Sequence, residues 1–196
     1  MVHLPPLPPN PGRSDPGPLA DTARRGLWIV LLTGASIGFS LVFACATPFA
    51  ALATLAARTM TRRDAVLLVL AAWLANQAIG YGFLHYPQTF DSVAWGVAIG
   101  VAALAALAAA LAVGGEPLQT GPVFATAIAF AAAFAVYELI LLATTLLLPA
   151  SDGAFSLPVI LDLLKVNAIA LAGLLALAYL ATSVGLSRRR PLRTEG

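Results

Sequence analysis

RRGLWIVLLTGASIGFSLVFACATPFAALATLAARTMTRR, residues 24–63, is an apolar stretch with arginines at both ends. Because Lys and Arg accumulate on the cytoplasmic side of a membrane, both ends are expected in the cytoplasm, and the stretch must cross the bilayer an even number of times. Its apolar part, residues 27–57, has 31 residues and is too short for two full spans of about 20 residues each. Pro48 breaks a helix because it lacks a backbone donor. The stretch therefore predicts a helix over about 27–46, a break at Pro48 and a short returning helix over about 49–57; one long kinked helix is the alternative.

The composition of the whole chain is typical of a membrane protein. Of its 196 residues, 60% are hydrophobic and 10% are charged, whereas a soluble domain carries about 25% charged residues because its surface meets water. The net charge of +2 rests on arginines near the ends of apolar stretches, which suits contact with anionic lipid headgroups. Nucleic acid would require a continuous basic face. We therefore expect membrane lipid as a partner and no nucleic acid.

Four further apolar stretches follow, over about 64–84, 92–113, 121–148 and 159–186. The sequence thus predicts an all-α, polytopic membrane helix bundle of about six membrane segments, the second one short, with both termini cytoplasmic. An alternative with five spans would place the termini on opposite sides, against the arginines. The predicted regions are a disordered, Pro-rich cytoplasmic tail over 1–25, the transmembrane bundle over 26–187, and a basic cytoplasmic tail over 188–196.

Ionisable side chains within the spans are costly in lipid and are therefore candidates for function. Glu138 and Lys165 lie at similar depth on consecutive antiparallel helices, which predicts an ion pair between them, and Asp162 lies on nearly the same face as Lys165. Asn167 is turned well away from Lys165 and is expected to contact another helix. One face of the 64–84 helix adds the aromatic and amide side chains of Trp73, Asn76, Gln77 and Tyr81.

Two interpretations of these side chains remain open. In the first, they floor a pocket that opens to the outside and holds a small solute, with aromatic contacts and with orienting groups from Lys165 and the amides. In the second, they satisfy one another and fix the register of the helices. The substrate-binding candidates of the first interpretation are Trp73, Asn76, Gln77, Tyr81, Glu138, Asp162 and Lys165.

Catalysis is not indicated. The two histidines are His3, in the Pro-rich tail, and His85, at an expected turn, and the single cysteine, Cys45, lies in apolar surroundings. The chain has no Ser/His/Asp set, glycine-rich phosphate loop or HExxH zinc motif. We therefore predict no enzyme, no cofactor and no metal site.

Pairs of small residues four positions apart allow membrane helices to approach closely. Gly34 and Gly38 form one such pair, and Gly96 and Gly100 form another. These glycine pairs can serve packing within the bundle or docking onto a separate membrane partner, and both interpretations remain open.

The chain resembles the substrate-capture subunits (S components) of energy-coupling factor (ECF) transporters, which take up vitamins and related micronutrients. The resemblance covers about 27–186 and lies in the length, the six segments with both ends cytoplasmic, and the short segment after the break ATPFAALA, residues 46–53. It implies that Gly34 and Gly38, or Ala46 and Ala50, face a coupling membrane subunit. It also implies that substrate binds near the outer surface, where Asn76, Gln77, Glu138 and Lys165 would fit.

The leading hypothesis is therefore a membrane substrate-binding subunit of a small-solute, vitamin-like micronutrient uptake transporter in the bacterial cytoplasmic (inner) membrane. The expected solute is anionic or zwitterionic and lies against Lys165, Asn76 and Gln77. An ATPase would be a separate chain, because this one has no P-loop. The alternative is a noncatalytic structural or assembly subunit of a membrane complex.

Overall fold

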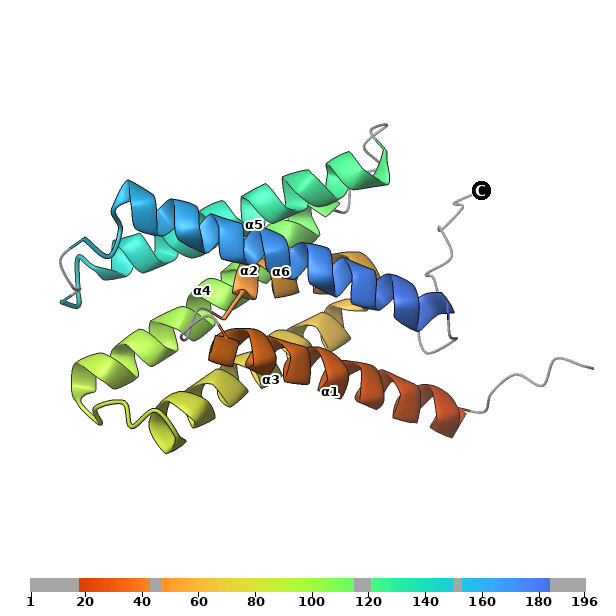
Figure 1. Ribbon diagram of the computed structural model, residues 1–196, viewed down its shortest axis with the longest axis horizontal. Coiled ribbons are helices and arrows are strands. Elements are labelled where there is room, and N and C mark those ends of the chain that lie inside the picture. The colour runs from red at the N-terminus through yellow and green to blue at the C-terminus, as the bar shows by residue number, and fades with distance from the viewer. Residues whose placement is uncertain (1–17, 43–46, 115–120, 150–152, 184–196) are drawn as a thin grey trace, which may run out of the picture.

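The computed structural model describes residues 18–42, 47–114, 121–149 and 153–183, which form six α-helices and no β-strand (Figure 1). The all-α bundle is as predicted, with one helix for each expected segment. Cys45 and Ala46 lie outside the described residues, as do the terminal ranges 1–17 and 184–196. The helices are α1 (Pro18–Val42), α2 (Phe49–Thr59), α3 (Arg62–Gly82), α4 (Phe90–Gly114), α5 (Pro122–Thr144) and α6 (Leu157–Ser183).

Four of these helices are long and apolar enough to cross a membrane. Their apolar parts are Arg62–Gly82, Phe90–Val113, Pro122–Thr144 and Leu157–Ala181. Each is close to the length of about 20 residues that a bilayer core requires. α2 is a shorter apolar helix. These helices indicate an integral membrane protein.

The start of α1 corrects one prediction. The helix begins at Pro18, inside the tail over 1–25 that the prolines predict to be non-helical, so the prediction is wrong for residues 18–25. Proline is well tolerated at the first helical position, because the backbone N–H that it lacks would have no partner there. No proline or glycine follows until Gly26, so the helix continues.

The break at Pro48 and the short returning helix are confirmed. Thr47 and Pro48 precede α2, and both are buried. Every residue from Phe49 to Ala56 is buried as well, because α2 packs against α3, α4, α5 and α6 and lies at the centre of the bundle (Figure 1). The many alanines of α2 let these helices approach its backbone.

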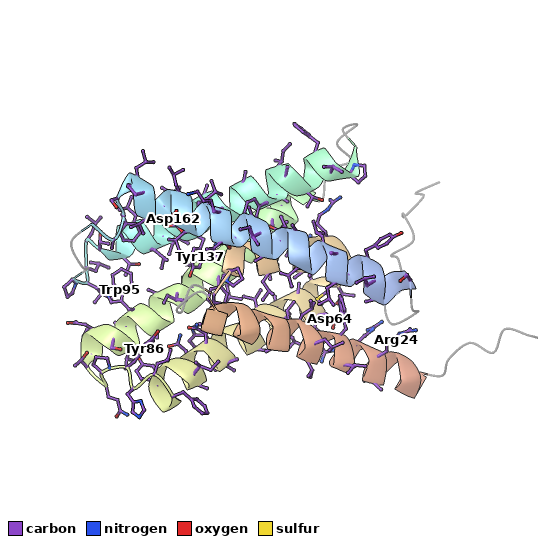
Figure 2. The ribbon with its side chains drawn as sticks, in the orientation of Figure 1. Arg24, Asp64, Tyr86, Trp95, Tyr137 and Asp162 are labelled. Atoms are coloured by element: carbon purple, nitrogen blue, oxygen red, sulfur yellow. The ribbon has the colours of Figure 1, made fainter. Side chains whose placement is uncertain are left out.

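The α3–α4 and α5–α6 connections share one end of the bundle. α1 begins and α6 ends at one end, and the α3–α4 and α5–α6 connections lie at the other (Figure 1). Arg24 and Asp64 lie toward the first end, and Tyr86, Trp95 and Asp162 toward the second (Figure 2). α1 ends and α2 begins short of the second end (Figure 1).

The glycine pairs have different surroundings. A Cβ atom at Gly100 would lie 2.8 Å from the indole of Trp73, and one at Gly96 would collide with the Gln77 side chain. This pair therefore packs within the bundle, against α3. Gly34 and Gly38 on α1 are exposed, and nothing lies within 4 Å of a Cβ added at either. Docking of α1 onto a membrane partner stays a prediction.

Candidate functional site

Polar and aromatic side chains meet where the chain enters α2. Asn76 on α3 donates a hydrogen bond from Nδ2 to Thr47 Oγ1 at 2.6 Å. The ring of Tyr137 on α5 lies 6.0 Å from the ring of Phe49, the first residue of α2, with an angle of 34° between the planes. Figure 2 shows Tyr137 near the middle of the bundle. Two of the long helices thus contact the same few residues around the break.

A third long helix supplies a cap for α2. The backbone N–H of Ala51 donates to Asn167 Oδ1 of α6 at 3.3 Å, and Asn167 Nδ2 donates to Leu163 O at 3.0 Å. The first N–H groups of a helix have no partner within the helix, and an unsatisfied one is costly where water is excluded. The expected contact of Asn167 with another helix is confirmed. We name the residues around the break the break site: Thr47, Phe49, Ala51, Asn76, Tyr137 and Asn167.

The amides predicted on α3 extend this network. Gln77 Nε2 lies 3.3 Å from Asn76 Oδ1 and donates to it, so hydrogen bonds run from Gln77 through Asn76 to Thr47. Both amide side chains are half-buried. Asn76 therefore belongs to the break site, and Gln77 is joined to it through Asn76.

Glu138 is an acidic residue within α5, a helix that contacts the break site through Tyr137. It follows Tyr137 directly, and its Oε2 atom is buried without a hydrogen-bond partner among the described residues. A buried carboxylate oxygen can accept a hydrogen bond or face a cation, and leaving it unpaired is costly. Glu138 therefore offers an acceptor that the bundle does not use.

The predicted ion pair between Glu138 and Lys165 is wrong. Lys165 Nζ instead lies 2.9 Å from Asp162 Oδ1 on the same helix, and the two side chains are 70% and 72% exposed. Residues two positions apart in a helix point about 200° apart. Because Asn167 faces α2, Lys165 must face outward. Lys165 and Asp162 thus do not contribute to the break site.

Trp73 and Tyr81 join α3 to α4 rather than line the break site. Trp73 Nε1 donates to Gly96 O at 2.8 Å. The Tyr81 hydroxyl lies 3.1 Å from Ser92 Oγ, and its ring lies edge-on to Tyr86 at 6.0 Å. Both side chains are half-buried and serve the packing of this helix pair.

Sequence reasoning did not assign Thr47, Phe49 or Asn167 to a binding site. One usable signal was an amide within the apolar helix α6, where a buried polar group needs a partner. The other was Thr47 directly before Pro48, at a break that leaves backbone groups to be satisfied. No family model matches this chain, and no curated protein or solved structure matches it.

Proposed function

We propose that this chain is a membrane substrate-binding subunit that captures a small organic solute for uptake, as an S component of an ECF transporter does. The observation that carries the proposal is the break site together with Glu138, the residue that follows Tyr137 on α5. The start of the returning helix α2 meets polar side chains from α3 and α6 inside an apolar bundle, and the buried Oε2 atom of Glu138 on α5 has no hydrogen-bond partner among the described residues. Membrane transporters place substrate sites where helices begin or end within the membrane, with helix N-termini directed at the substrate.

The groups at this site favour a zwitterionic solute. Glu138 Oε2 would accept a hydrogen bond from an amino group. The N-terminus of α2 favours a negative group, because the aligned peptide dipoles leave partial positive charge there. Lys165 has no part in the proposal, since it faces outward and pairs with Asp162. The outward direction of Lys165 thus removes the reason for a purely anionic solute.

The proposed orientation places both termini in the cytoplasm of a bacterium and the α3–α4 and α5–α6 connections outside. It is supported by the arginines near the start of α1 and near the α2–α3 connection, because such clusters stay on the cytoplasmic side. A coupling membrane subunit and a separate ATPase would complete the transporter. The exposed Gly34 and Gly38 of α1 are the proposed contact for that subunit.

Native mass spectrometry of the protein, purified gently from its own membranes, tests this function. We expect a copurified small molecule on the wild-type chain, with a membrane subunit and an ATPase in part of the sample. A stable protein partner without any small molecule would contradict the proposal.

That contrary result would favour the second candidate, a noncatalytic structural or assembly subunit. One observation supports this candidate: Asn76, Gln77 and Asn167 all hydrogen-bond within the bundle. The substitution Gly34→Leu would then release the partner, because it would fill the open face of α1. Gly96→Leu does not test docking, since Gly96 packs against α3.

A further inference from the structure

The face of α6 that points away from the bundle carries an ion pair. Asp162 and Lys165 are joined at 2.9 Å, and both side chains are more than two-thirds exposed. Exposed residues continue this face along the helix at alternating spacings of three and four, which is the spacing of one helical face. We name it the α6 outer face: Asp162, Lys165, Ile169, Ala172 and Ala176.

The bundle itself does not cover this face. α6 packs chiefly on α2, through the buried residues Asn167, Ala170 and Leu174, which lie on the opposite side of the helix. Charged side chains within an apolar span are costly unless they are paired and shielded from lipid. A pair that is so exposed in the single chain is therefore expected to have a further covering in the membrane.

We propose that a second copy of this chain covers the α6 outer face and forms a two-fold dimer. The argument is charge complementarity. The face presents one negative and one positive group about one helical turn apart. A two-fold axis along the membrane normal brings two parallel α6 helices together, so that Asp162 of one protomer meets Lys165 of the other, twice. The pair is complementary to itself, and the interface carries no net charge.

The rest of the α6 outer face allows the two helices to come close enough for ion pairs between the protomers. Ala172 and Ala176 are four residues apart and both exposed. Small side chains at this spacing let two helix backbones approach within a membrane. The ion pairs between protomers then fix the register of the two helices, and the alanines pack against each other further along α6.

Charge reversal tests the dimer by light scattering of the purified full chain in detergent micelles. Asp162→Lys places lysines opposite each other, and Lys165→Asp places aspartates opposite each other. Each single reversal should weaken dimerisation about tenfold or more, because like charges repel across an interface. The double variant Asp162→Lys/Lys165→Asp restores opposite charges and should recover the dimer. A monomeric wild type, or a dimer that the single reversals leave unchanged, would overturn the proposal.

Disulfide crosslinking in native membranes gives a second readout that does not depend on detergent. In a Cys45→Ala background, Ala172→Cys should crosslink to its own copy on mild oxidation. Val97→Cys on α4, whose side chain is 53% exposed, is the matched control and should remain uncrosslinked. Equal crosslinking at both positions, or none at Ala172→Cys, would contradict the interface and leave lipid headgroups as the covering of the ion pair.

Discussion

Asn167 shows how one side chain can fix a helix inside an apolar bundle. It is 6% exposed, and its amide joins the first turn of α2 to a carbonyl group of α6. Because Asn167 is buried, water cannot take the place of either hydrogen bond. The position of α2 within the bundle therefore depends on a group that accepts and donates at once, which an apolar side chain cannot do.

The substitution Asn167→Leu tests this role. It leaves the Ala51 N–H without its acceptor, which should lower the free energy of unfolding by about 1–3 kcal/mol. Thermal unfolding in detergent measures the change. Ser183→Ala on the same helix is the control, because Ser183 is exposed and bonds only to a carbonyl of its own helix. Equal stability of the two variants would show that Asn167 does not cap α2.

The same residue explains what could be predicted for α6 and what could not. The spacing of Asn167 and Lys165 shows that only one of them can face the bundle. Which one does so is not visible in the sequence, because the rest of α6 is apolar on all sides, and in a membrane protein an apolar face can meet lipid as well as the bundle. The predicted Glu138–Lys165 pair required Lys165 to face the bundle, which is wrong. The predicted contact of Asn167 with another helix is confirmed.

At the scale of the element, the helices were largely predictable, because a span needs a fixed number of apolar residues and proline ends it. The Pro48 break and α2 illustrate this. The contacts of α2 were less predictable, since a helix of alanine and leucine carries no mark of how many neighbours it will have. Its burial among four helices comes from the structure alone.

Two threonines of α2 provide a matched test of this central position. Thr54 is fully buried and Thr59 is exposed, and each donates a hydrogen bond to the carbonyl four residues before it. In a Cys45→Ala background, Thr54→Cys should resist N-ethylmaleimide in the folded protein, and Thr59→Cys should react. Mass spectrometry measures the extent of labelling of each variant. Comparable labelling of both would place α2 at the surface of the bundle.

At the scale of the whole molecule, the arginine clusters and the two ends of the bundle predict the orientation in the membrane. Gln88 lies in the α3–α4 connection and is exposed, so Gln88→Cys should react with a membrane-impermeant thiol reagent added to intact cells. Thr59→Cys, near the α2–α3 connection, should react only after the cells are opened. Labelling in the reverse order would invert the proposed topology.

The central claim is that a solute binds at the break site and contacts Glu138. Native mass spectrometry of the wild type, Glu138→Gln and Lys165→Ala, purified in parallel, tests it most directly. Glutamine keeps the shape of the side chain but removes the charge, so the copurified small molecule should be lost from Glu138→Gln. Lys165→Ala should retain it, because Lys165 faces outward. A small molecule that remains on Glu138→Gln and is lost from Lys165→Ala would contradict the account.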